Sequence, residues 1–219
     1  MKILNLYAGI GGNRTYWGEE HEITAIESDP IIESIYADRY PNDTTVVADA
    51  HQYLLEHYDE YDFIWSSPPC PSHSRMRYWV GVKHKGYNPL FPDMRLYEEV
   101  LFLKHHFDGP WCVENVRSYY EPLVSPQEVG RHYFWANFPI DNMKVEVTGI
   151  RSKNTIKSLE QHFGIDLSAY KLPNKRQVLR NCVEPQLAAH ILDCATFPHY
   201  WIGPEPSRRV AEWKAPIQD

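Results

Sequence analysis

The feature that most constrains the fold is an alternation of short apolar runs with helix-forming segments over the first 70 residues. Strands are expected at residues 3–7, 22–26, 44–48 and 63–65. Helices are expected through residues 16–18, over residues 31–40 after Pro30, and through residues 53–55. Strands that alternate with helices predict an α/β fold with a parallel sheet, which binds its ligands at the carboxyl ends of the strands.

Those carboxyl ends carry residues suited to a nucleotide-like ligand. Gly9, Gly11 and Gly12 follow the first strand and allow a ligand to approach the backbone closely. Glu27, at the end of the second strand, is placed to accept ribose hydroxyls, and Asp49, at the end of the third, to face an adenine amino group. Each acid is also suited to capping a helix. The set predicts an adenosine-bearing ligand, although the glycine spacing is neither Gly-x-Gly-x-x-Gly nor a P-loop.

The fourth strand leads into Pro68, Pro69 and Cys70. Prolines cannot continue a central strand, so they present Cys70 on a stiff turn. His73, Arg75 and Arg77 follow, and their positive charge is expected to favour the thiolate. Taken alone, this segment favours a small, half-buried packing cysteine over a nucleophile.

The remaining segments add a candidate acid and a basic loop. Residues 76–92 are basic and aromatic without a clear period, which predicts a long loop, followed by a packing helix at 94–107. Glu114 interrupts an apolar strand at 111–116, where burial is expected to raise its pKa. A further strand at 131–138 brings Arg131 or His132 toward the same cleft.

The expected division of the chain into regions follows changes in its amino-acid composition. A cofactor-binding and catalytic core is expected at residues 1–138, and a small target-recognition region at 139–176 with a short helix at 156–163. Residues 177–195 return to the core and end in an apolar helix, and residues 196–219 are expected to form a surface tail.

Charge is distributed unevenly in a chain whose net charge is −7. Residues 1–62 carry three basic and thirteen acidic residues, whereas residues 141–180 carry eight basic and four acidic ones. This asymmetry fits a polyanion bound on one face, or a solvated charge pattern without a partner.

No apolar run approaches the length of a membrane span, and the chain enters its first strand directly, so neither a membrane segment nor a signal peptide is expected. The cysteines show neither Cys-x-x-Cys spacing nor a compact disulfide framework, and they are Cys70, Cys112, Cys182 and Cys194. Reduced thiols, a cytoplasmic location and no metal site are therefore predicted.

Together these segments resemble the DNA cytosine-5 methyltransferases. Residues 4–12 are similar to the glycine-rich cofactor motif of that family, and Ser67-Pro68-Pro69-Cys70 matches its Pro-Cys nucleophile motif. Glu114-Asn115-Val116 matches its Glu-Asn-Val motif, and residues 131–138 are similar to the corresponding strand of the eukaryotic de novo branch. Residues 180–185 resemble the closing Gly-Asn-x-Val-x-Pro motif. The motifs occur in family order over residues 4–192.

The chain departs from the family pattern at several positions. Pro71 and His73 replace the usual Gln and Phe, and Arg180 replaces a glycine. His132 occupies the place of the second arginine of the Gln-x-Arg-x-Arg element, so either Arg131 or His132 is expected to contact the base. The target-recognition region is short.

The resemblance implies a Rossmann-like S-adenosylmethionine-dependent methyltransferase fold, with helices on both faces of a mostly parallel sheet and a small recognition appendage. It implies methyl transfer to carbon 5 of cytosine in double-stranded DNA, on a base flipped out of the duplex. The expected catalytic residues are Cys70 as nucleophile, Glu114 as acid, and Asn115, Arg131 and His132. The residues expected to bind S-adenosylmethionine are Tyr7, Ala8, Gly9, Gly11, Gly12, Glu27, Ser28, Asp49, Ala50, Pro68, Asn181 and Val183.

Three other functions fit the same residues. The chain is alternatively an RNA cytosine-5 methyltransferase, an enzyme that modifies free cytidine nucleotides, or a catalytically silent relative that acts as a DNA-binding or regulatory partner. Its size favours a stand-alone enzyme of a bacterium or its phage, of the restriction-modification kind. The oligomeric state and the recognised DNA sequence are not predicted.

Overall fold

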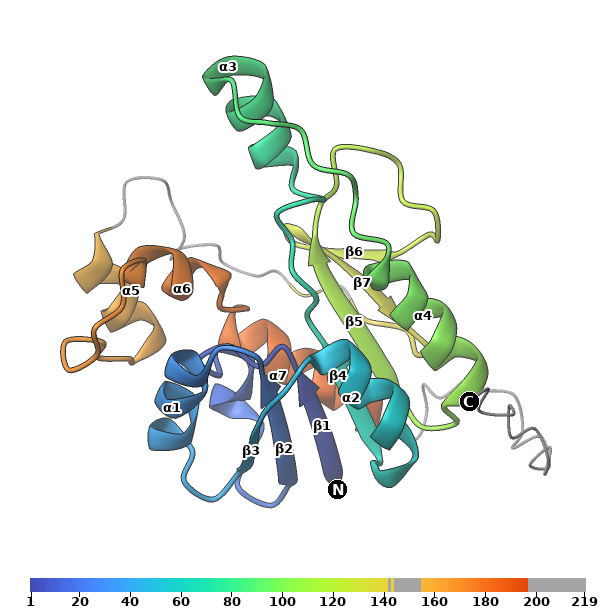
Figure 1. Ribbon diagram of the computed structural model, residues 1–219. Helices are drawn as coiled ribbons and strands as arrows, with labels where there is room; N and C mark the ends of the chain where they lie inside the picture. Colours follow the sequence, from blue (N-terminus) through green and yellow to red (C-terminus); the bar gives the residue numbers. More distant parts are fainter. Residues whose placement is uncertain (142, 144–154, 197–219) are drawn as a thin grey trace, which may run out of the picture.

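A seven-stranded sheet organises the part of the chain that the computed structural model describes, which comprises residues 1–141, 143 and 155–196. The strands are β1 (Lys2–Leu6), β2 (Glu22–Glu27), β3 (Thr44–Val47), β4 (Phe63–Ser66), β5 (Trp111–Val116), β6 (Gln127–Val129) and β7 (His132–Ala136). Their order across the sheet is β3-β2-β1-β4-β5-β7-β6. The first five are parallel, whereas β7 runs antiparallel to both of its neighbours. The predicted Rossmann-like fold with a mostly parallel sheet is confirmed (Figure 1).

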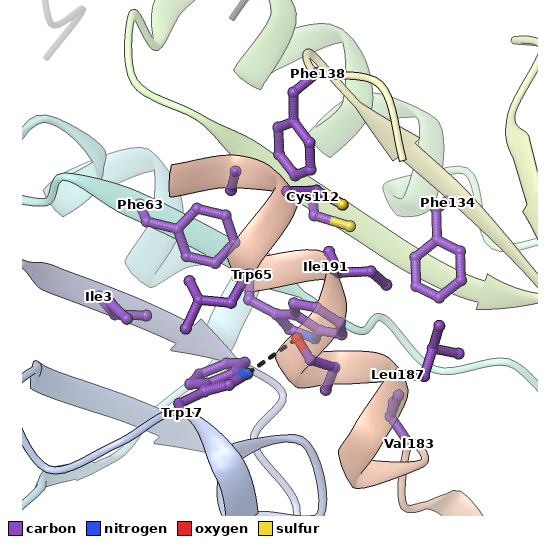
Figure 2. Packing of buried hydrophobic residues seen from close by; sticks show 14 of the residues in the cluster. Ile3, Trp17, Phe63, Trp65, Cys112, Phe134, Phe138, Val183, Leu187 and Ile191 are labelled. Carbon is purple, nitrogen blue, oxygen red and sulfur yellow. Dashed lines mark hydrogen bonds between the residues drawn. The ribbon is translucent and has the colours of Figure 1, made fainter. Parts of the chain in front are cut away.

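Helices cover both faces of the sheet, as predicted, and this explains why the central strands β1, β4 and β5 are buried along almost their whole length. On one face α7 (Pro185–Thr196) packs with a short 3-10 helix (Asn13–Tyr16) against Ile3, Phe63 and Trp65. Figure 2 shows this layer, in which the Trp17 indole donates a hydrogen bond of 3.3 Å to a carbonyl oxygen of α7. The opposite face is covered by α2 (Ala50–His57) and α4 (Arg95–His106).

The expected helix after Pro30 is confirmed as α1 (Pro30–Arg39). Proline fits its first turn because it has no N–H to leave unpaired. The Asp29 carboxylate caps the same end by accepting the backbone N–H groups of Ile31 and Ile32. The helix predicted through residues 16–18 is instead a 3-10 helix that ends at Tyr16.

A small helical lobe, α5 (Ile156–Phe163) and α6 (Lys175–Asn181), follows the undescribed segment. The predicted helix at 156–163 is thereby confirmed. The lobe buries Leu159, Phe163 and Leu179 in one cluster with Ile10 and Ile35 of the amino-terminal part. α6 crosses the expected boundary at residue 176, and parts of the region at 139–176 and nearly all of the tail at 196–219 lie outside the described residues.

The loop predicted at residues 76–92 is partly wrong, because the chain forms a π-helical turn (Arg77–Val82) and then α3 (Lys83–Lys85). We call residues 75–91 the arm. Ring contacts support the arm and leave no apolar period in the sequence. The Tyr78 ring stacks on that of Tyr119, with 4.4 Å between the ring centroids, and within the arm the Arg77 guanidinium lies over the ring of Tyr87. The arm projects beyond the carboxyl edge of the sheet (Figure 1).

Among the described residues, no helix is both long enough and apolar enough to cross a lipid bilayer. The same residues hold no group of three His, Cys, Asp or Glu side chains arranged to bind a metal ion. All four cysteines are free thiols.

Candidate active site

A cavity of about 360 Å³ opens at the carboxyl ends of β1, β2, β4 and β5. It brings together residues that lie on or next to five strands, the fifth being β7 with His132, and residues at the end of α6. The predicted site residues that line it are Tyr7, Ala8, Gly9, Gly12, Glu27, Ser28, Pro68, Cys70, Glu114, His132, Asn181 and Val183.

The other predicted site residues lie outside this lining. Asp49 caps α2 by accepting the backbone N–H of Gln52 at 3.0 Å, and its second oxygen lies 3.4 Å from the Arg95 guanidinium. Ala50 is buried in the first turn of that helix. Arg131 is exposed, so of the two candidates for contact with the base it is His132 that reaches the cavity.

Asn115 and Gly11 do not line the cavity but lie next to residues that do. The side-chain amide of Asn115 donates a 2.9 Å hydrogen bond to the carbonyl oxygen of Pro68, so it holds the turn that precedes Cys70. Gly11 faces α1, where a Cβ atom would lie 2.4 Å from a ring carbon of Tyr40.

Ten lining residues were not predicted, and they are Ile10, Asn13, Ile32, Ser67, Pro69, Pro71, Val116, Val178, Arg180 and Cys182. Most adjoin a predicted residue in the sequence, so wider motif boundaries would have included them. Ile32 and Val178 come from α1 and α6, and no sequence pattern singles them out.

The turn after β1 has the geometry needed to hold a ligand against its backbone. Tyr7 and Gly9 both have φ of 56°, in the left-handed region, which glycine adopts without strain and tyrosine does not. Gly9 lines the cavity, and a Cβ atom there would meet no heavy atom within 4 Å. The open side of this turn therefore faces the cavity, in the manner expected for an adenosine-bearing ligand.

Glu27 is fixed in place by the backbone around it. One carboxylate oxygen accepts the Gly9 N–H at 3.0 Å, and the other accepts the N–H groups of Ser28 and Asp29 at 2.8 and 3.0 Å. A carboxylate has about four acceptor positions, so the oxygen bound to Gly9 keeps one for a ligand hydroxyl. These residues fit the ribose of the expected cofactor.

Cys70 lies in a tight turn whose charge environment differs from the prediction. Its carbonyl oxygen accepts the N–H groups of His73 and Ser74, both at 3.0 Å. Burial, together with the nearby Glu114, raises the pKa of the Cys70 thiol to about 11. The expectation that nearby positive charge favours the thiolate is therefore wrong for the protein without substrate.

The reason lies in where the basic side chains point. His73 is buried, its Nδ1 atom bonds the Tyr120 hydroxyl at 2.5 Å, and burial lowers its pKa. Arg75 is exposed, and Arg77 donates a hydrogen bond to a backbone oxygen of the arm.

Glu114 and His132 face each other in the cavity, and burial opposes the charged form of both side chains. Glu114 is 7% exposed, and burial raises the pKa of its carboxyl group to about 7, although a hydrogen bond from Ser67 opposes this. The raised pKa agrees with the prediction for an acid within an apolar strand. His132 lies 3.8 Å away, and its pKa is lowered to about 4 by burial and then by Arg131 and Arg117. The cavity thus holds a carboxyl group that titrates near neutral pH beside a neutral imidazole.

Comparison with known proteins identifies the first part of the chain. Residues 1–100 match the model of the family of C-5 cytosine-specific DNA methylases, which confirms the resemblance for that part and implies S-adenosylmethionine as the cofactor. No curated protein matches the sequence.

Several solved structures are similar in part. DNMT2 of Spodoptera frugiperda is 26% identical over 52% of this chain and 35% of its own, with a TM-score of 0.38. A protein described as a "putative DNA modification methyltransferase" encoded within a prophage (E. coli) is 18% identical over 55% of this chain and 33% of its own, with a TM-score of 0.36. A SAM-dependent methyltransferase of Agrobacterium tumefaciens is 13% identical over 55% and 40%, with a TM-score of 0.37. The chain thus matches about a third of the length of the first two.

Proposed function

Because residues 1–100 match the C-5 cytosine-specific DNA methylases, we propose that the chain methylates carbon 5 of cytosine in DNA. The observation that carries the proposal is that one cavity is lined by a cysteine thiol, a buried carboxylic acid and a glycine turn with room for a ligand. Each part has a place in the chemistry of methylating an aromatic carbon that is a poor nucleophile.

The cofactor is proposed to lie over the turn at Gly9, with the Glu27 carboxylate on its ribose. S-adenosylmethionine supplies the methyl group when it is bound. Asp49 and Ala50, expected near the adenine, stand outside the cavity lining and remain part of the proposal only through the resemblance.

Cys70 is proposed to add to carbon 6 of a flipped cytosine. Its proton must leave, and N3 of the ring must gain one, for the addition to yield a neutral enamine. Glu114 can serve both needs, because a carboxyl group with a pKa of about 7 exists in both forms near neutral pH. It donates its proton to N3 and takes up that of the thiol. Carbon 5 of the enamine would then take the methyl group that the bound cofactor would supply. To release the product, the carbon-5 proton passes to water, Cys70 leaves carbon 6 with the proton held by Glu114, and Glu114 takes back the proton of N3.

Two basic elements flank the edge of the sheet that carries the cavity, and they support a nucleic acid as the substrate (Figure 1). The arm carries Arg75, Arg77, Lys83 and Lys85, and no acidic residue occurs between positions 71 and 92. The lobe of α5 and α6 contributes Lys175 and Arg180, among others, from the other side. Phosphate contacts from such elements supply affinity without sequence preference.

The test is transfer of tritiated methyl groups from S-adenosylmethionine to duplex DNA, RNA and dCMP. We expect DNA to be labelled, and Cys70→Ala to abolish labelling. Cys194→Ala is the matched control, because that thiol lies in α7 outside the cavity lining. A duplex containing 5-fluorocytosine should trap a covalent adduct at Cys70.

The alternatives give different results in the same assay. Labelling of RNA or dCMP alone would replace DNA by that substrate, and labelling undiminished in Cys70→Ala would reject the nucleophile. No labelling of any substrate and no trapped adduct would favour a catalytically silent relative.

A further inference from the structure

Glu99 of α4 is a fully buried carboxylate that the proposed chemistry does not use. It accepts a 2.6 Å hydrogen bond from the Tyr7 hydroxyl and another of 2.6 Å from the Ser66 hydroxyl. Nδ1 of His51 lies 3.1 Å from the oxygen that binds Tyr7. Burying a carboxylate costs free energy unless its oxygens are bonded, and here both are.

The partners of Glu99 belong to three different connections at the carboxyl edge of the sheet. Tyr7 begins the glycine turn after β1, lines the cavity and has a left-handed backbone. Ser66 is the last residue of β4 and directly precedes the turn that presents Cys70. His51 lies in the first turn of α2, which follows β3.

Basic side chains lie near the Glu99 carboxylate. The hydrogen bond to Glu99 raises the pKa of His51, with a further contribution from Glu98, whose carboxylate lies 3.4 Å from Nε2. Arg95, also on α4, faces the same group and opposes this effect. Burial and the Glu99 carboxylate raise the pKa of the Tyr7 phenol, so Tyr7 stays protonated and acts as the donor.

We propose that Glu99 is a positioning residue for methyl transfer, which holds the cofactor turn through Tyr7 and the nucleophile turn through Ser66. The inference rests on the proposed function. A single rigid carboxylate on α4 thereby sets the placement of the cofactor relative to Cys70, since neighbouring strands β1 and β4 carry the two turns. His51 serves as its counter-ion.

The two hydrogen bonds that Glu99 accepts can be removed separately by substitution. Tyr7→Phe removes only the hydroxyl on the cofactor side, and Ser66→Ala only the one on the nucleophile side. We expect Tyr7→Phe to weaken binding of S-adenosylhomocysteine about tenfold, the loss typical of one hydrogen bond to a charged group. Ser66→Ala should keep that affinity and lower kcat at saturating cofactor.

Glu99→Gln should show both effects, and its loss of affinity should not add to that of Tyr7→Phe in a double-mutant cycle. Glu98→Gln is the matched control, because it removes a neighbouring carboxylate that contacts His51 but neither hydroxyl. Isothermal titration calorimetry with S-adenosylhomocysteine gives the affinities, and thermal melts check folding.

A Glu99→Gln protein that melts at a lower temperature but binds S-adenosylhomocysteine as tightly as the unaltered chain would overturn the inference and leave the proposed function intact. Unchanged binding of S-adenosylhomocysteine by Tyr7→Phe would also overturn the inference and leave the proposed function intact. This second variant keeps the test decisive if Glu99→Gln does not fold. An unaltered chain that binds no S-adenosylhomocysteine would contradict the proposed function and the inference together.

Discussion

Replacing Glu114 by glutamine should stabilise the protein while it abolishes methyl transfer. Burial raises the pKa of Glu114 from the ordinary 4.5 to about 7, so the folded chain binds this proton more tightly than the unfolded chain. Unfolding therefore releases a proton between these two pH values, and the free energy of unfolding falls as the pH rises through that window. Glutamine keeps the shape of the side chain and cannot ionise.

The size of the effect follows from the two pKa values. At about 1.4 kcal/mol for each tenfold change in proton affinity, ionised Glu114 costs about 3 kcal/mol above pH 7. Part of this cost is already present at pH 5. We therefore expect the stability advantage of Glu114→Gln over the unaltered chain to grow by about 2 to 3 kcal/mol between pH 5 and pH 8.

Urea unfolding of both proteins at intervals across this range measures the difference, and the contributions of other groups cancel. His132 does not interfere, because its lowered pKa of about 4 leaves it neutral in the folded chain throughout. Glu121→Gln, at an exposed position, is the control and should give a constant difference. A constant difference for Glu114→Gln as well would refute the raised pKa.

Two further predictions test the cavity wall. Gly11→Ala should destabilise the fold by about 2 kcal/mol, because the φ of Gly11 is 74° and a Cβ atom there would lie 2.4 Å from Tyr40. Gly9 has a φ of 56° and no such clash, so Gly9→Ala should lower the stability by only about 1 kcal/mol but weaken cofactor binding. Thermal melts and calorimetry separate the two, and equal stability losses would contradict this account. His132→Arg places a permanent cation beside Glu114 and should lower the pKa of that acid, so the fall in kcat at high pH should begin about one pH unit lower. An unshifted pH profile would show that the residue at position 132 does not influence the acid.

The sheet was predictable because its first four strands are short segments rich in apolar residues that end at or within three residues of a glycine, a proline or an acid. β6 was missed because it has three residues, two of them polar, and pairs only with β7 at the edge. The helical turns of the arm were missed because ring stacking of Tyr78 on Tyr119 supports them, and residues 41 positions apart in the sequence leave no local pattern.

The cavity was predictable to the extent that topology alone determines it. Parallel strands end at one edge, so Glu27, Cys70 and Glu114 had to lie near one another once the strands were identified. Side-chain direction was not predictable: His73 turns inward to Tyr120 and away from the thiol, and Glu99 looked like part of an ordinary amphipathic helix. Both depend on packing between elements that are distant in the sequence.

The half-buried position of Cys70 has a consequence beyond the proposed methyl transfer. Peroxides and alkylating agents react with thiolates, and a thiol with a pKa of about 11 is almost entirely protonated at the pH of a cell. The surroundings that delay attack on a base therefore also protect the sulfur from oxidation. If Cys70 is the nucleophile, the same surroundings would preserve its reactive form while no substrate is bound.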